Sequence, residues 1–130
     1  MAVIPVARAL FLCKEVIFEE RTRNVSLINC FGRFRLPEFP GVVDPFFVYA
    51  RLINGSGRVT LRVTIDPLDT MNPVYAQPIE FTFPDRTTEV DLRLRVVSCR
   101  FPRPGRYTAN LYVGHDLIAQ TEIEVLPKEV

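Results

Sequence analysis

The sequence contains no tryptophan, one histidine and three cysteines among its 130 residues. Sixteen Lys and Arg side chains stand against fifteen Asp and Glu, so the formal net charge is only +1. A balance this even argues against nucleic acid or an anionic membrane as a partner, because both select strongly basic surfaces. No hydrophobic run approaches the roughly 20 residues that a membrane-spanning helix needs.

The cysteines also exclude several classes of protein. Cys13, Cys30 and Cys99 are odd in number and have no C-x-x-C spacing, which disfavours a disulfide framework or a zinc site. The apolar stretch 9–13 lacks the basic segment that opens a signal peptide and contains too few residues for one. We therefore expect three free thiols and a cytoplasmic protein.

Motifs for catalysis and for cofactor binding are missing as well. The sequence has no phosphate-binding glycine loop and no nucleophile elbow, and His115 stands alone in a turn. Cys99 beside Arg100 would favour a thiolate if it were exposed, but cysteines are more often buried. The loop aspartates are too sparse to define a calcium site. The sequence predicts no enzyme, no metal and no cofactor.

The composition is that of one globular domain. Hydrophobic residues make up 48% and charged residues 24% of the chain, and 130 residues suffice for one hydrophobic core. We expect a single domain that covers residues 1–130, without repeats or low-complexity tracts.

The stretch from Pro102 to Val125 predicts a β-hairpin. Apolar residues alternate with polar ones along 106–113 and again along 117–125, with Gly114-His115-Asp116 between them. A three-residue loop pairs Tyr107 with Ile123, Leu111 with Ala119 and Val113 with Leu117, so that both apolar sets share a face.

A second hairpin is predicted between 46–53 and 58–66. A four-residue loop, Asn54-Gly-Ser-Gly57, would pair Ile53 with Arg58 and Tyr49 with Arg62. Under this register one face is apolar throughout, and the other carries a mixture of aromatic and arginine side chains.

The remaining stretches complete an all-β pattern. Residues 7–17 predict a strand broken near Lys14-Glu15, residues 25–31 a central strand, and the proline-rich 36–45 an irregular connection. Residues 79–83 and 90–96 alternate as strands, and direct pairing would set Glu80 against Asp91, so we place them in different sheets. Residues 126–130 read as a tail. The pattern predicts an immunoglobulin-like antiparallel β-sandwich of about eight strands with Greek-key connections.

Two resemblances support this fold. Pro104-Gly-Arg-Tyr107 resembles the tyrosine corner of immunoglobulin-like sandwiches, in which a Tyr side chain ties a strand to the preceding turn. Together with the stretches 9–13, 25–30 and 45–48, this segment is similar to a family of small bacterial β-sandwich proteins without an assigned function. The resemblance implies the fold and a bacterial setting, and it brings no functional residues.

The outer face of the second predicted hairpin is the candidate functional surface. Aromatic, aliphatic and arginine side chains of this kind are enriched at protein interfaces; the candidate residues are Phe47, Tyr49, Arg51, Ile53, Arg58 and Arg62. We expect the partner to be another protein or a second copy of this chain. An alternative is that the N-terminal segment or the proline-rich loop covers this face within the molecule. A further alternative is a small-ligand or carbohydrate site in the loops 36–45 and 67–78.

Overall fold

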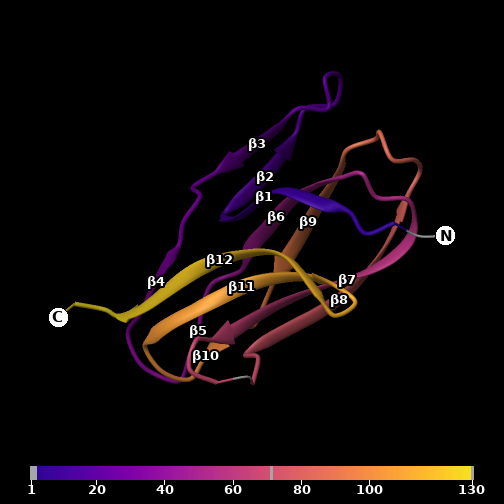
Figure 1. Cartoon of the computed structure of the whole chain (residues 1–130). Helices are drawn as coiled ribbons and strands as arrows, with labels where there is room; N and C mark the ends of the chain where they lie inside the picture. The colour runs from indigo at the N-terminus through magenta and orange to yellow at the C-terminus, as the bar shows by residue number, and fades with distance from the viewer. Residues whose placement is uncertain (1–2, 71, 130) are drawn as a thin grey trace.

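The computed structural model describes residues 3–70 and 72–129, and in this part of the chain every regular element is a strand. Two sheets form the body of the protein (Figure 1). The larger has the order β4–β12–β11–β7–β8, with the strands Arg33–Leu36, Asp116–Pro127, Gly105–Val113, Gly57–Pro67 and Tyr75–Phe83. The smaller has the order β1–β6–β9, with the strands Val6–Cys13, Phe46–Ile53 and Val90–Val96.

Two short antiparallel pairs complete the fold. One joins β5 (Gly41–Val42) to β10 (Arg100–Phe101). The other joins β2 (Glu15–Phe18) to β3 (Val25–Ile28) and forms a hairpin that projects from the body near β1 (Figure 1). We call this hairpin, residues 15–28, the arm. In the described residues no helix has the length and apolar character needed to cross a membrane.

Both sheets contribute to one hydrophobic core. Alternate residues of β6, including Val48 and Leu52, contact alternate residues of β7 and β11, including Ile65 and Leu111, and all four are almost completely buried. Period-2 alternation therefore places one apolar face of each sheet toward the other. The all-β prediction is confirmed, but the expectation of antiparallel pairing throughout is wrong, because β12 pairs with β4 in parallel.

The hairpin predicted at Pro102–Val125 forms as β11 and β12. Tyr107 pairs with Ile123 and Leu111 with Ala119, as the sequence predicts. Near the turn the prediction is wrong, because Val113 pairs with Asp116 and a bulge follows Leu111. A two-residue turn with Gly114 at φ +59° closes the hairpin, and the bulge takes up the extra residue without reversing the faces.

The tyrosine corner is present. The Tyr107 hydroxyl donates a hydrogen bond to the Arg103 carbonyl oxygen at 2.6 Å, and the Tyr107 ring meets the Phe101 ring edge-on. This contact anchors the start of β11 to the preceding turn, as the Pro-Gly-x-Tyr spacing predicts.

The hairpin predicted between 46–53 and 58–66 does not form. Strand β6 pairs with β1 and β9, whereas β7 pairs with β11 and β8 in the other sheet. Residues 54–56 carry the chain across the core instead of turning it back, and Gly55 passes so close to the Phe83 ring that a Cβ would lie 2.9 Å from it. Alternation of polar and apolar residues is the same in both arrangements, so parity alone did not distinguish them.

Some of the remaining predictions are confirmed and others are wrong. The break after Cys13 and the separation of β8 from β9 into different sheets are confirmed. Residues 25–31 are not a central strand, because β3 pairs only with β2. The tail prediction is also wrong, since β12 continues to Pro127 and pairs in parallel with β4. Twelve strands are found in the described residues, more than the sequence predicts. The predicted loop 67–78 is shorter than expected because β8 begins at Tyr75, and it contains Met71, which lies outside those residues.

Candidate functional site: the arm cleft

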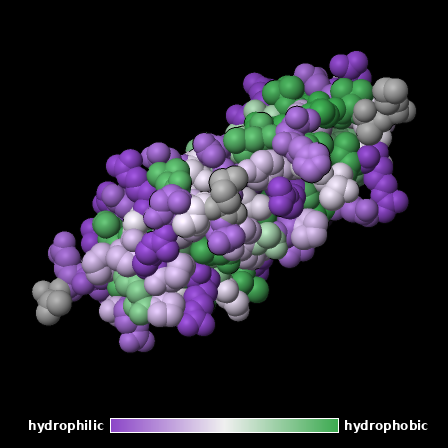
Figure 2. Space-filling view, turned by 60° about the horizontal axis from the view of Figure 1, so that its bottom comes forward, coloured by the Kyte–Doolittle hydropathy of each residue, from purple (hydrophilic) through white to green (hydrophobic). Residues whose placement is uncertain are grey.

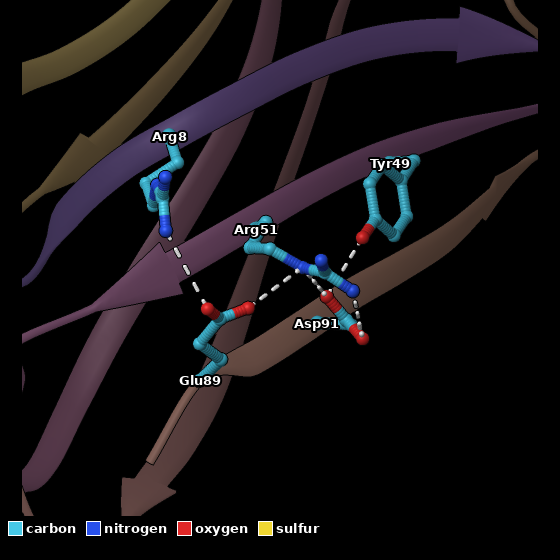
Figure 3. A network of polar contacts seen from close by, with 5 residues as sticks. All are labelled: Arg8, Tyr49, Arg51, Glu89 and Asp91. Atoms are coloured by element: carbon cyan, nitrogen blue, oxygen red, sulfur yellow. Dashed lines mark hydrogen bonds and ion pairs between the residues drawn. The ribbon is translucent and has the colours of Figure 1, made fainter. Parts of the chain in front are cut away.

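The outer face of the β1–β6–β9 sheet carries a fixed polar network (Figure 3). Arg51 and Asp91 lie directly opposite each other on β6 and β9, and the Arg51 Nε is 2.9 Å from Asp91 Oδ1. The Tyr49 hydroxyl donates to the same Asp91 oxygen at 2.7 Å. Glu89 extends the network, with an Oε2 3.2 Å from Arg51 Nε and an Oε1 3.5 Å from Arg8 Nη1.

This network holds its charges in place. The hydrogen bond to Asp91 is the main cause that raises the pKa of Arg51, so the guanidinium stays charged at every accessible pH. Burial, together with the hydrogen bond to Asp91, raises the pKa of Tyr49 to about 12. The phenol is therefore a neutral hydrogen-bond donor at physiological pH, and Asp91 is the shared acceptor.

The arm packs beside this network through a small apolar cluster. Val16 on β2 contacts Cys13 and Tyr49, and all three are nearly inaccessible to solvent. The Phe18 and Phe47 rings flank the Arg93 guanidinium, at 5.8 and 5.4 Å from their centroids. One apolar face of a two-stranded arm is thus buried against the sheet.

A cleft of about 950 Å³ lies between the tip of the arm and the edge of the sheet. We call it the arm cleft. Its lining is a mixture of aromatic, acidic and basic side chains, namely Phe18, Glu19, Glu20, Arg23, Asn24, Arg51, Glu89, Val90 and Asp91. Phe18 on the arm is more than 40% exposed and Val90 also lines the cleft, so the cleft has apolar surface beside its charges.

The arm tip is an ordered wall of this cleft. The Glu19 carboxylate accepts hydrogen bonds from the Thr22 backbone N–H and hydroxyl, at 2.6 and 3.1 Å, and the Glu19 N–H donates to the Asn24 carbonyl at 2.8 Å. The hydrogen bonds from Thr22 lower the pKa of Glu19, so this carboxylate is ionised at neutral pH.

The cleft ends at an unpaired sheet edge. Strand β9 is the last strand of the smaller sheet, and its seven residues contain neither Pro nor Gly. The edge strand β8 of the larger sheet carries Pro78 in its middle, which removes a backbone donor and hinders strand addition there. Of these two edges, only β9 has a backbone without proline.

The structure unites only part of the predicted interface. Phe47, Tyr49 and Arg51 share the outer face of β6. Phe47 and Tyr49 pack against the arm, so an N-terminal segment covers this part of the face, as the alternative interpretation expects. Ile53 lies on the same face at the end of β6, opposite Val6.

Arg58 and Arg62 belong to a different surface. They lie on the outer face of β7 in the larger sheet, where Arg58 forms an ion pair with Glu80 and the Arg62 guanidinium stacks on Tyr112 at 4.8 Å. The predicted pairing of Tyr49 with Arg62 is therefore wrong, because β6 and β7 are not neighbours.

Of the residues that line the cleft, only Arg51 was among the predicted interface residues, and Glu89, Asp91 and Phe18 are among those that the sequence did not reveal. A signal for Asp91 was present in the alternation of 89–95, since an acidic residue at that parity complements Arg51 across a strand pair. Phe18 had none, because its place depends on how the arm folds back.

The other candidates find no supporting geometry. The loop 36–45 lines a hollow of about 310 Å³, and residues 67–69 line one of about 170 Å³, at or below the lower limit of roughly 300 Å³ for ligand pockets. Within the described residues no group of three or more His, Cys, Asp or Glu side chains could hold a metal ion. Cys99 is buried, and burial raises its pKa to about 12, so it is not a reactive thiolate.

We compared the chain with curated proteins, solved structures and family models. None of the curated proteins matches it. A β-glucosidase from Listeria innocua, in complex with isofagomine, covers 92% of this chain at 11% identity and a TM-score of 0.48. A β-glucosidase from Kluyveromyces marxianus covers 80% at 13% identity and a TM-score of 0.41. In both cases the chain spans only 16% of the other protein. A family model described as "Family of unknown function (DUF6941)" matches residues 8–126.

Proposed function

The chain belongs to this family of unknown function, and we propose that it is a non-enzymatic, single-domain protein-interaction module. The partner is an extended segment of another protein, or of a second copy, that adds as a strand to β9 and lies against the arm cleft. The observation that carries the proposal is the open β9 edge beside a cleft whose polar groups are already fixed by one another.

Main-chain groups supply the first part of the recognition. An edge strand presents alternate N–H and C=O groups that only another extended backbone can satisfy in series. The inner side chains of β9 leave room for such a strand, because Val90 and Leu94 are only half-buried whereas Leu92 and Val96 are buried. A partner strand with apolar side chains at alternate positions would complete the cover over Val90 and Leu94.

Charge supplies the second part. Arg93 and Arg95 point to the outer face of β9 and are exposed. A partner strand with acidic side chains at the matching positions would form favourable cross-strand pairs. Fixed neighbours such as Asp91 and Arg51 need no reorganisation on binding, which lowers its entropic cost.

The proposal extends to the fold type and the cellular setting of the protein. The three-stranded sheet shares one core with the sheet in the order β4–β12–β11–β7–β8. This arrangement and the tyrosine corner support an immunoglobulin-like sandwich with Greek-key connections. The odd number of cysteines supports a cytoplasmic, reducing compartment, and the sequence resemblance supports a bacterial source.

The test compares two pairs of charge reversals in the full chain. Arg93→Glu with Arg95→Glu alters the β9 edge, and Arg58→Glu with Arg62→Glu alters the outer face of the larger sheet. Self-association is measured by sedimentation and binding to other proteins by affinity capture, after circular dichroism has shown that both variants are folded. We expect binding to be lost only with the β9 pair. Loss of binding with the control pair alone would move the interface to the larger sheet and refute the proposal.

A further inference from the structure

Two cysteines bracket the arm at its base. Cys13 is the last residue of β1, two residues before the arm, and Cys30 lies two residues after β3. An antiparallel bridge joins Leu12 to Phe31, with the Phe31 N–H donating to the Leu12 carbonyl at 2.9 Å. The bridge and the pair Glu15–Ile28 share one register, and that register sets Cys13 across from Cys30.

The two thiols lie near each other. Leu12 and Phe31 both pack into the main core. Because successive side chains of a strand alternate, Cys13 points to the outer face, where it joins the cluster of Val16 and Tyr49. Cys30 precedes Phe31 and is close enough to Cys13 to act on its thiol electrostatically. Opposed residues of an antiparallel pair have Cα atoms about 4.5–5.5 Å apart. That spacing is within the range of about 4.4–6.8 Å that a disulfide spans.

We propose that Cys13 and Cys30 form a reversible disulfide that ties the two stems of the arm together. The bond would close residues 13–30 into a ring and fix the arm against the sheet. The arm cleft would then have one rigid wall in the oxidised protein and a wall free to open in the reduced protein. The disulfide itself does not depend on the proposed binding function, because it follows from the Leu12–Phe31 bridge at the base of the arm.

A low-molecular-weight disulfide such as oxidised glutathione is the oxidant. The Cys30 thiolate, which is exposed, attacks one sulfur of the oxidant, the S–S bond breaks, and one thiol leaves. The Cys13 thiolate then attacks the Cys30 sulfur of the mixed disulfide and expels the second thiol. The two protein thiols lose two protons and two electrons, and the oxidant is reduced to two thiols.

Accessibility sets the order of these steps. Cys13 is fully buried, and burial, with a smaller contribution from nearby Cys30, raises the pKa of its thiol. The second step therefore requires the arm to open far enough to expose Cys13. Cys99 is a control within the same chain, because it is buried in the main core away from the arm.

The test incubates the full chain with oxidised glutathione or with a reducing agent, followed by alkylation in denaturant and tryptic digestion. We expect the free thiols to fall from three to one, with peptide 9–14 linked to peptide 24–33. Cys99→Ala should give the same linked peptides, and Cys30→Ala should give none. Retention of all three thiols, a glutathione adduct on Cys30 without the link, or a bond between two chains would each overturn the proposal.

Hydrogen exchange separates the bond from its effect on the arm. Amides of residues 15–28 should exchange at least severalfold more slowly in the oxidised protein, while amides of β11 stay unchanged. Equal exchange of the arm in both redox states would refute its role in fixing the arm.

Discussion

Asp91 is the shared hydrogen-bond acceptor of two side chains. Its two carboxylate oxygens accept hydrogen bonds from Tyr49 and Arg51, and its side chain is only 19% exposed. Removing such an acceptor leaves a partly buried phenol and a guanidinium without their shared partner, which is costlier than the loss of a solvated ion pair.

We therefore expect Asp91→Ala to lower the free energy of unfolding by about 1–3 kcal/mol. The measurement is the midpoint of denaturation in urea. Glu80→Ala is the matched control, because its carboxylate pairs with Arg58 while 60% exposed and exposed pairs contribute about 0–1 kcal/mol. Equal midpoints for both variants would mean that the network does not stabilise the sheet.

Tyr49 makes the stability sensitive to alkaline pH. Its pKa is raised to about 12 in the folded protein, against about 10 in an unfolded chain. Since the folded state holds the proton more tightly, this contribution is complete below pH 10 and is lost as the pH rises toward 12. Tyr49→Phe has no hydroxyl to titrate, so its free energy of unfolding should lack this pH dependence. We therefore expect the stability advantage of the wild type over the variant to fall by about 2–3 kcal/mol between pH 10 and 12. A constant difference would contradict the expectation.

Tyr107 tests the corner that ties β11 to its turn. Tyr107→Phe removes the donor to the Arg103 carbonyl and should destabilise the fold by about 1 kcal/mol or somewhat more. Tyr112→Phe is the control, because Tyr112 contributes its ring to Arg62 and keeps that contact as Phe. Thermal denaturation of both variants measures the difference, and an unchanged midpoint for Tyr107→Phe would show that the corner contributes nothing.

The arm is the element that sequence reasoning described least well. Its strands are recognisable from their apolar residues, but the sequence placed 25–31 in the centre of a sheet. In the structure β3 has a single partner, and Ile17 and Ile28 remain more than 40% exposed. A strand that is buried on both faces and a strand that leaves one apolar face exposed have the same local composition. Composition alone therefore did not distinguish a central strand from the arm.

Val16 is the residue that fixes the arm, and the prediction at this level concerns its local opening. Val16→Ala removes two methyl groups at a position only 2% exposed, worth about 1.5 kcal/mol at about 0.8 kcal/mol each. Exchange of the arm amides should therefore accelerate about tenfold. Ile17→Ala, at a position 49% exposed, should leave the exchange nearly unchanged. Acceleration throughout both sheets would instead show that the arm unfolds only with the whole protein.

Strand identity was more predictable than strand partnership. The sequence predicted the hairpin β11–β12 because a short turn restricts its strands to one pairing. It predicted strands at β6 and β7 but joined them wrongly, since a four-residue connection with two glycines fits a hairpin and a crossing between sheets equally well. The candidate site shared this limit: Phe47, Tyr49 and Arg51 come from one strand, and the rest of the site depended on which strands became its neighbours.

The whole molecule is built from pairings between distant segments. Strand β1 pairs with β6, and β4 with β12, so much of the fold requires the closure of long loops before contacts form. All-β folds of this kind refold in about milliseconds to seconds. We expect stopped-flow refolding of the chain within that range, and a refolding time in microseconds would contradict the long-range topology.

The parallel pairing of β4 with β12 also has a mechanical consequence. The molecule is elongated (Figure 2), and β1 begins near one end of it while β12 ends at the other (Figure 1). Tension applied between them runs along the strands, so the hydrogen bonds that hold β12 to β4 and β11 are loaded in shear and together. Bonds loaded together break as a group, whereas bonds at the end of a peeled hairpin break one at a time. The protein should therefore resist stretching along this axis far better than traction across its sheets.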